Sequence, residues 1–415
     1  MSQDRTAPLP PGIVTGPAWG EPLPGSYAQA AAPFRPLFAR IREHAAARET
    51  ERSLPFEALE WLREARLTAA RVPREHGGLG LSLPGFFELL IELSEAESNL
   101  TQALRAHFGF VEHILASDPE RQARWFARLA NGAIAGAAWS ETGEAKQAQF
   151  STRLTRTPDG WRLNGTKFYT TGSLFADWIH VGASDENGES VSLTIDRRAP
   201  GVDVIDDWDG MGQRLTASGT SRFSDVPVEE HEIVAGRAPF AYSEAYYQLV
   251  HLATLAGINR AAANEAAALV AARTRSYSHA PAARPADDAQ VLQVIGRVRA
   301  HAWTASAAVA QAARALERAE RAVGQAHEAA AIAEAEIEIW QAQTVVSQLV
   351  LDATANVFDA LGASATLRPQ ALDRHWRNAR TITSHNPRIY KDRIVGEFAV
   401  KGTLPAGQWR IGVAG

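Results

Sequence analysis

The pattern of apolar residues changes twice along this chain, and this change limits the folds that it can adopt. From about residue 27 to residue 131, apolar residues recur at the helical period, as they do between Phe34 and Ile41. Between about Ala133 and residue 235, short β-like runs follow one another with turn sequences between them. From about Tyr242 the helical period returns. Short strands without intervening helices favour a small antiparallel barrel or sandwich, here placed between two helical parts.

Three turn sequences divide the β-like part. Thr157-Pro158-Asp159-Gly160 and Asn164-Gly165 combine residues that favour tight turns, so we expect the chain to reverse at both. Asp185-Glu186-Asn187-Gly188 separates two β-like runs and predicts a further hairpin.

The boundaries of these patterns predict five segments. They are a loose arm rich in Pro and Gly at residues 1–25, an N-terminal helical domain at 26–132, a middle β domain at 133–235, a C-terminal helical bundle at 236–400 and a tail at 401–415. A length of 415 residues with 46% hydrophobic residues is enough for more than one core. Within the bundle, the Glu- and Ala-rich run from Ala319 to Glu338 predicts a solvated helix face.

Charge and composition argue against several classes of function. The net charge of −5 gives no sign of nucleic-acid binding, and the absence of cysteine excludes disulfides and thiolate catalysis. No stretch of about 18 uncharged apolar residues predicts a membrane span, and the N-terminus lacks the pattern of a signal peptide. No spacing of His, Asp and Glu predicts a metal site. We therefore expect a cytoplasmic protein without a metal ion.

Three local motifs occur in an order that is typical of one superfamily. They are Pro73-Arg74-Glu75-His76-Gly77-Gly78-Leu79-Gly80, Trp139-Ser140-Glu141-Thr142-Gly143 and Lys167-Phe168-Tyr169-Thr170-Thr171-Gly172. Together with the order of helices, strands and helices, they resemble the acyl-CoA dehydrogenase superfamily over roughly residues 30 to 400. The resemblance implies an N-terminal α-helical domain, a middle antiparallel β-barrel or sandwich and a C-terminal four-helix bundle.

Four further segments narrow this resemblance to one branch. They are Asp206–Gly219, Ala272–Tyr277, Asp373–Thr381 and His385-Asn386-Pro387. These segments are similar to those of the flavin-dependent monooxygenases typified by dibenzothiophene monooxygenase. Members of that branch use O2 and reduced FMN, which a separate NAD(P)H:flavin reductase supplies. The resemblance thus implies a two-component monooxygenase that oxygenates a small sulfur- or nitrogen-containing compound.

The stretch from Arg377 to Pro387 distinguishes the chain from the dehydrogenases. Those enzymes carry a Glu there that removes a proton from the substrate, whereas this chain has Asn386, which cannot act as a base. A monooxygenase needs no such base, but it must keep water from the oxygenated flavin and can offer it a proton donor. His385 stands beside Asn386, and a His with a pKa near neutrality suits that role. His385 is therefore the first catalytic candidate.

The resemblance also implies the remaining site residues. The second catalytic candidate is His107, which is shifted by one residue from a His of the branch, and the hydroxyl of Thr171 is expected near the reactive edge of the flavin. The residues expected to contact the cofactor are Trp139, Ser140, Tyr169, Thr170, Thr171, Trp208, Ser218 and Arg275.

Arg275 is expected to bind the flavin phosphate, because a guanidinium group suits bidentate phosphate contact. In this family the contact often reaches the flavin of a neighbouring subunit, which implies a homotetramer. Ser364 stands where the branch sometimes has a second phosphate-binding Arg, so that second contact is in question.

Two other functions fit parts of the sequence. An acyl-CoA dehydrogenase or oxidase with FAD would need a relocated base, for which Glu244 and Glu265 are the nearest candidates. A member that binds flavin without catalysis would tolerate the loss of His385, which could cap the end of a helix. In that case the aromatic residues expected at the flavin could be ordinary core residues.

Overall fold

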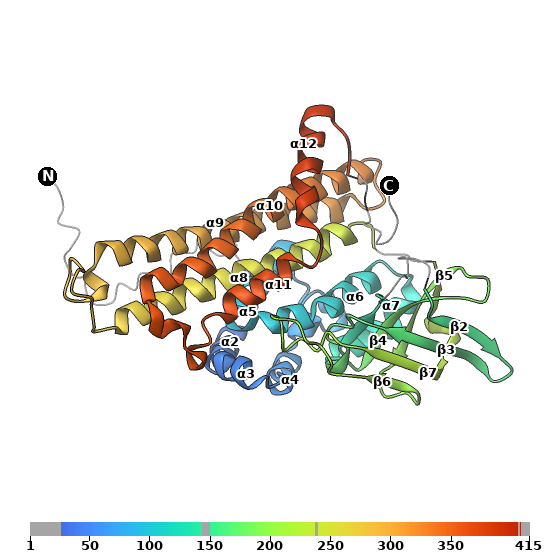
Figure 1. Ribbon diagram of the computed structural model, residues 1–415. Coiled ribbons are helices and arrows are strands. Elements are labelled where there is room, and N and C mark those ends of the chain that lie inside the picture. Colours follow the sequence, from blue (N-terminus) through green and yellow to red (C-terminus); the bar gives the residue numbers. More distant parts are fainter. Residues whose placement is uncertain (1–25, 143–149, 237–239, 406, 408–415) are drawn as a thin grey trace.

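The computed structural model describes residues 26–142, 150–236, 240–405 and 407. The predicted N-terminal arm, most of the predicted tail and Gly143 of the second motif lie outside these residues. Figure 1 shows long helices along the upper part of the molecule, shorter helices beneath them and a sheet at one end. In the described part of the chain, no helix is both long and apolar enough to cross a membrane.

The N-terminal helices bury one apolar face each, as α2 does with Phe34, Phe38 and Ile41. They are α1 (Ser26–Ala31), α2 (Phe34–Glu43), α3 (Ala45–Glu51), α4 (Phe56–Glu64), α5 (Leu83–Ala103), α6 (Arg105–Leu115) and α7 (Pro119–Ala130). Helix α5 is interrupted at Glu97, where φ is −161° and ψ is 102°. The Glu97 carboxylate accepts a hydrogen bond from the backbone N–H of Asn99 and so caps the turn that follows.

Among the described residues, eight strands form one sheet in the order β6-β7-β3-β2-β4-β5-β8, with β1 added beside β4. The strands are β1 (Ala135–Ala138), β2 (Arg153–Thr157), β3 (Gly160–Lys167), β4 (Trp178–Ser184), β5 (Ser190–Asp196), β6 (Val202–Val204), β7 (Ser221–Val228) and β8 (Ile233–Ala235). Most pairs are antiparallel, as predicted, but β4 pairs in parallel with β1 and with the end of β2.

Two of the three predicted turns are confirmed, at Thr157–Gly160 between β2 and β3 and at Asp185–Gly188 between β4 and β5. The turn predicted at Asn164-Gly165 is wrong, because both residues lie inside β3. There the register with β7 shifts between Leu163 and Gly165. A Cβ on Gly165 would lie 2.5 Å from Thr152 Oγ1, so this glycine permits a bulge and a close approach of β2.

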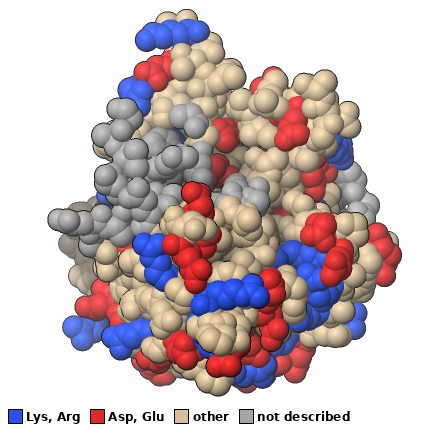
Figure 2. All heavy atoms as spheres, turned by 90° about the vertical axis from the view of Figure 1, so that its right-hand side faces the viewer, with Lys and Arg blue, Asp and Glu red and all other residues tan. Residues whose placement is uncertain are grey.

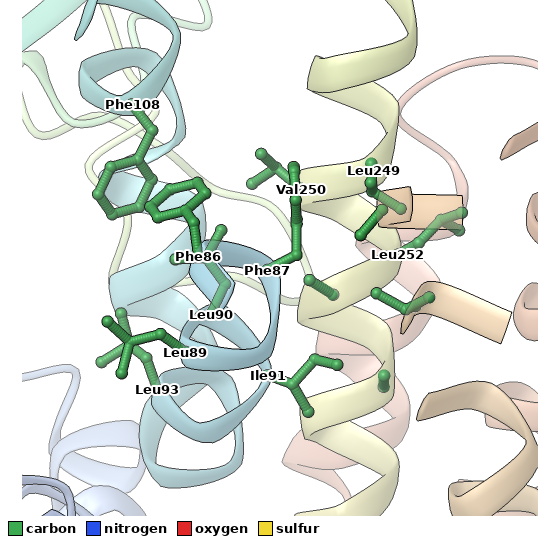
Figure 3. Packing of buried hydrophobic residues seen from close by; sticks show 14 of the residues in the cluster. Phe86, Phe87, Leu89, Leu90, Ile91, Leu93, Phe108, Leu249, Val250 and Leu252 are labelled. Carbon is green, nitrogen blue, oxygen red and sulfur yellow. The ribbon is translucent and has the colours of Figure 1, made fainter. Parts of the chain in front are cut away.

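The C-terminal part is a bundle of long helices, and this order of helices, sheet and helical bundle confirms the predicted fold. The helices are α8 (Ser243–Ala272), α9 (Ala289–Ala322), α10 (Glu328–Leu361), α11 (Arg374–Thr383) and α12 (Lys391–Lys401). Helix α8 is apolar on all sides because α5, α9 and α10 surround it. Figure 3 shows Phe86 of α5 against Phe108 of α6, while Ile91 of α5 points toward α8. The two helical parts therefore share one core.

One face of α10 departs from the prediction. Glu336 lies in the run that was expected to be solvated, yet it is only 5% exposed. Four residues further along α10, the ring of Trp340 lies 4.1 Å from the ammonium group of buried Lys391. Lys391 is the first residue of α12, which rises above the bundle in Figure 1. The buried lysine therefore fixes the base of this projecting helix.

Charges are mixed on the end of the molecule that carries the sheet. Figure 2 shows acidic and basic side chains interspersed over this face, with no large area of one sign. A nucleic-acid interface would present a continuous basic stripe, and this face has none among its described residues.

Candidate active site

The segment between β6 and β7, residues 205–220, is held by amide side chains from two helices. The backbone N–H of Gln213 donates to Oδ1 of Asn378 in α11 at 2.6 Å. The backbone N–H of Leu215 donates to Oδ1 of Asn99 in α5 at 3.2 Å. All four residues are buried. The segment is therefore held by contacts with two helices that are distant in sequence.

A second contact brings two of the predicted motif segments together. Arg377 of α11 donates to the carbonyl of Met211 at 3.0 Å. A Cβ on Gly212 would lie 2.2 Å from the carbonyl oxygen of Arg377, so only glycine allows this approach. The segments Asp206–Gly219 and Asp373–Thr381, distant in sequence, are thus neighbours in the fold.

Three hydroxyl groups form a directed chain in this segment. Thr216 donates its single hydroxyl proton to the carbonyl of Gln213 at 2.8 Å. It must then accept from Ser218 at 2.7 Å, and Ser218 must in turn accept from Thr171 at 2.7 Å. Thr171 is half-buried, and its oxygen keeps a free lone pair. Thr171 is therefore an acceptor toward any group that approaches it.

Two aromatic rings lie beside this chain. The ring centroids of Tyr169 and Trp208 are 6.1 Å apart, and the indole N–H donates to the carbonyl of Gln213 at 3.0 Å. Tyr169 is 56% exposed. Tyr169, Gln213 and Ala217 have φ values of 59°, 51° and 47°, which are uncommon for residues with a Cβ. Such strain often marks functional sites. The structure thus brings Tyr169, Thr171, Trp208 and Ser218 together.

The other residues predicted to line the flavin are engaged within the protein. The ring of Trp139 packs against β4. The backbone carbonyl of Ser140 accepts a hydrogen bond from the third motif at 2.9 Å, while its side chain is exposed. Thr170 is buried, and its hydroxyl donates to a backbone carbonyl at 3.0 Å. Of these three, Ser140 is exposed, Trp139 is partly buried and Thr170 is fully buried.

His107 lies in the core between α6 and β1. Its Nε2 is 2.7 Å from the carbonyl oxygen of Thr68, and its Nδ1 accepts a hydrogen bond from the N–H of Ala135 at 3.2 Å. The ring therefore carries its proton on Nε2. Burial lowers the pKa of His107 to about 4. Neither nitrogen is left to face a substrate.

His385 follows α11 and reaches solvent, while its ring centroid lies 4.3 Å from that of buried His251. Desolvation by surrounding protein and the charge of Arg105 lower the pKa of His385 to about 3. Solvent at the exposed side of the ring weakens this desolvation but does not reverse its direction. The lowered pKa favours the neutral imidazole at pH 7, and its direction is below the value near neutrality that the sequence suggested.

Asn386, at the position of the dehydrogenase base, joins two helices of the bundle. Its Nδ2 donates to Oε1 of Gln248 in α8 at 2.7 Å. Its Oδ1 accepts from Nε2 of Gln343 in α10 at 3.0 Å. Both ends of the amide are thus engaged, and the residue fixes the segment that carries His385.

Arg275 is not brought together with the other predicted site residues of the same chain. It is exposed and lies after the end of α8. Tyr247, near the start of that helix, accepts a hydrogen bond from Arg105 at the other end of the bundle. At 1.5 Å per residue, roughly 37 Å of helix separates Tyr247 from the end of α8. Thr171 lies at the Arg105 end of the bundle, because a Cβ on the neighbouring Gly172 would lie 2.0 Å from the carbonyl oxygen of Ala103. A single FMN is too short to touch both Arg275 and Thr171 of one chain.

Glu265, one of the two relocated bases considered, is held as a carboxylate. Burial alone would raise its pKa, but His375 and Arg374, each 2.7 Å away, lower it to about 2. A carboxylate with such a pKa is a poor base. The other candidate, Glu244, is half-buried at the start of α8.

We expect this carboxylate to make stability depend on acid pH. The pKa of Glu265 is depressed on folding, so its contribution is present above about pH 4.5 and is lost as pH falls toward 2. The loss is at most about 3 kcal/mol. Urea denaturation of the parent and Glu265→Gln between pH 6 and pH 3 measures it. A Glu265→Gln protein with the same pH slope as the parent would contradict the expectation.

An open pocket of about 590 Å³ lies elsewhere, between α6, the start of α8 and the end of α9. None of the predicted site residues line it. Its polar groups satisfy one another, because Glu112 accepts from Arg71 at 2.7 Å and from Tyr242 at 2.6 Å. The first motif contributes Pro73, Arg74, Glu75 and Gly80 to this pocket, whereas the hydroxyl chain and the rings of Tyr169 and Trp208 lie outside it.

A buried ion pair supports the strand that leads to Tyr169. Lys167 is 0% exposed, and its ammonium group is 2.7 Å from Glu141 Oε1. Burial opposes ionisation of Glu141, but Lys167 and the N–H groups of Ser151 and Thr152 lower its pKa to about 2. Glu141 belongs to the second motif and Lys167 to the third. The occurrence of both motifs in one sequence was therefore the signal for this ion pair. Arg105 and His251 belong to no motif, so only the fold reveals them.

Three family models match successive parts of the chain. They describe the N-terminal, middle and C-terminal domains of acyl-CoA dehydrogenase and match residues 35–133, 136–226 and 249–387. Over 389 residues the chain is 28% identical to a probable FMNH2-dependent monooxygenase, SfnC, of Pseudomonas putida, covering 90% of this chain and 95% of the relative.

Two solved structures are also similar. FMN-bound TdsC of Paenibacillus sp. A11-2, a dibenzothiophene monooxygenase, has a TM-score of 0.83 and 28% identity, covering 92% of this chain and 99% of the other. The methanesulfinate monooxygenase MsuC of Pseudomonas fluorescens has a TM-score of 0.81 and 25% identity, covering 93% and 99%. The chain therefore belongs to the acyl-CoA dehydrogenase family, within the branch of its flavin-dependent monooxygenases.

Proposed function

We propose that this protein is a two-component monooxygenase that uses reduced FMN and O2 to oxygenate a small sulfur- or nitrogen-containing compound. The observation that carries the proposal is Asn386, an amide engaged at both ends where a dehydrogenase needs a base. With Glu265 held as an ion, the alternative of an acyl-CoA dehydrogenase has lost one of its two relocated bases. The named activities of SfnC, TdsC and MsuC support the same class of reaction.

The hydroxyl chain fits a reduced flavin. Thr171 can only accept at its free side, because its proton is given to Ser218. A reduced isoalloxazine carries an N–H at its reactive edge, whereas the oxidised ring has an acceptor there. Tyr169 and Trp208 offer aromatic faces beside it. When bound, reduced FMN supplies the two electrons that O2 activation requires.

His385 is the proposed catalytic residue. A neutral imidazole has one N–H that can donate a hydrogen bond and one nitrogen lone pair that can accept one. His385 can therefore donate a hydrogen bond from its ring N–H to the oxygen atom that is transferred to the substrate. Asn386 positions it through Gln248 and Gln343. The fully engaged His107 is proposed to be structural.

Arg275 is proposed to reach the FMN phosphate held by a neighbouring subunit, within a homotetramer. The length of α8, which separates Arg275 from the end of the bundle near Thr171, supports a contact between subunits. We expect Arg275→Ala to weaken FMN binding by about 10- to 100-fold, because hydrogen bonds to charged groups are worth about 1.5–3 kcal/mol. Arg284→Ala removes an exposed arginine from the same connection and serves as the control.

FMN titration of each variant at high and low protein concentration measures this effect. If the partner subunit supplies the arginine, the parent and Arg275→Ala should bind FMN alike once the assembly is diluted into single chains. Equal FMN affinity of the parent and Arg275→Ala in the assembled state would refute the contact.

Isotope labelling tests the activity itself. The protein receives reduced FMN under ¹⁸O2 together with a thioether, a sulfinate or a primary amine, and products are read by mass spectrometry. We expect one labelled oxygen in the product, and none when reduced FMN is omitted. Bleaching of bound FAD by an acyl-CoA without oxygen, in a protein that does not bind reduced FMN, would establish a dehydrogenase instead. We further propose that the enzyme works in the cytoplasm, where NAD(P)H and its flavin reductase are available.

A further inference from the structure

Arg105, His251 and His385 gather beside the Asn386 amide. Arg105, the first residue of α6, donates from Nε to the carbonyl of Tyr247 at 3.3 Å, and its guanidinium carbon lies 4.7 Å from the centre of the Tyr247 ring. Tyr247 and His251 lie one turn apart on α8, and the His251 ring faces that of His385, so the contact of Arg105 with Tyr247 brings the three groups to the same end of the bundle. Within the described residues, no carboxylate forms an ion pair with Arg105, and its terminal nitrogens have no hydrogen-bond partner.

His251 gives a second and independent observation. It is 1% exposed, and neither of its ring nitrogens has a hydrogen-bond partner among the described residues. Its ring faces that of His385 at 4.3 Å between centroids. Leaving a polar group buried and unpaired is costly, so each such group in a native protein calls for an explanation. A ligand that accepts hydrogen bonds here would provide one.

Two carboxylates of the bundle, Glu336 and Glu244, interact with a second cation. Both act on the ammonium group of Lys391, which lies over Trp340. Glu244 also acts on Arg105, so it reduces the positive potential of the three groups. The Glu244 carboxylate, however, interacts electrostatically with both Arg105 and Lys391, whereas the Glu336 carboxylate interacts with Lys391. The balance around Arg105 and the two histidines therefore favours a negatively charged ligand.

We propose that Arg105, His251 and His385 form a subsite for a negatively charged oxygen group of the substrate, such as a sulfinate, sulfonate or carboxylate. Arg105 supplies a permanent charge and two free N–H-bearing nitrogens, and the imidazoles supply a third and a fourth contact. The substrate class is thus a small organic anion and not an uncharged aromatic. This inference rests on the proposed function, because His385 is also its catalytic residue.

Binding of two matched probes tests the subsite without turnover. Methanesulfinate and dimethyl sulfone share a methyl–SO2 unit, but only the first is charged. In calorimetric titrations of the FMN-loaded protein, we expect methanesulfinate to bind at least about 10-fold more tightly. Equal binding of the two probes, or tighter binding of dimethyl sulfone, would overturn the proposal with the parent protein alone.

Variants then assign the charge to Arg105. Arg105→Gln should weaken methanesulfinate binding by about 10- to 100-fold and leave FMN and dimethyl sulfone binding unchanged, while Arg105→Lys should recover part of the loss. Arg388→Gln removes an arginine that lies near His385 but contacts Gln348, and it should bind methanesulfinate like the parent. Equal losses in Arg105→Gln and Arg388→Gln would refute the assignment. Because the readout is binding, failure of the ¹⁸O2 experiment and failure of the subsite remain distinguishable.

Discussion

Replacing His385 with alanine is expected to slow product formation by about 100-fold or more, the usual range for loss of a positioned proton donor. The ring lies beside His251 and follows the Asn386 bridge, so its removal takes away the hydrogen-bonding group and opens space for water. Consumption of reduced FMN and O2 should continue, with hydrogen peroxide replacing oxygenated product. Parallel assays of product and peroxide, with reductase in excess, measure both.

Two further variants sharpen this test. His385→Gln keeps an N–H near the position of Nε2 and should recover part of the rate. His279→Ala removes an exposed histidine from the connection after α8 and should behave like the parent. Product formation at the parental rate in His385→Ala would reject the catalytic assignment, and the flavin-binding, non-catalytic alternative would then gain support.

Replacing Lys167 with methionine is expected to lower the free energy of unfolding by about 3–5 kcal/mol, because it leaves the Glu141 carboxylate buried without its cation. Four contacts from Ser151 and Thr152 would still hold the carboxylate, so the loss belongs at the lower end of this range. Denaturation by urea at pH 7 gives the value directly. The strand that leads to Tyr169 should loosen at the same time, which FMN affinity would report.

The matched control is Lys401→Met, which removes an exposed lysine at the end of α12 and should change stability by less than about 0.5 kcal/mol. Adding Glu141→Gln to Lys167→Met should restore part of the loss, since the unpaired charge disappears. A single Lys167→Met variant as stable as Lys401→Met would show that the pair contributes nothing.

The sequence predicted the turns whose conformation depends on the residue types in the turn itself. Gly160 and Gly188 close turns because their left-handed backbone is favourable for glycine alone, and both turns are where the sequence placed them. Asn164-Gly165 has similar turn-forming residues but lies in a strand, because Thr152, just before the neighbouring strand β2, needs the space above Gly165. That requirement comes from a tertiary contact, which no window of sequence contains.

The sequence predicted those residues of the candidate site that lie in recognisable motifs. Motif letters identified Tyr169, Thr171, Trp208 and Ser218, which the fold brings together. They did not reveal that His385 has a lowered pKa, because Arg105 and the packing around the ring are supplied by elements far away in sequence. Glu336 was missed for a similar reason: composition suggested a solvated helix face, whereas tertiary packing leaves this residue only 5% exposed.

The segment between β6 and β7 has a consequence for local opening. It is tied to the C-terminal cap of α3 by the Arg52–Asp206 pair at 2.9 Å, to α5 through Asn99 and to α11 through Asn378. A loop held on one side can open alone, whereas this one cannot separate without breaking contacts to three helices at once. Its amide protons should therefore exchange with solvent as slowly as those of the helical core. The wall of the proposed cofactor site should therefore open no more readily than the helical core.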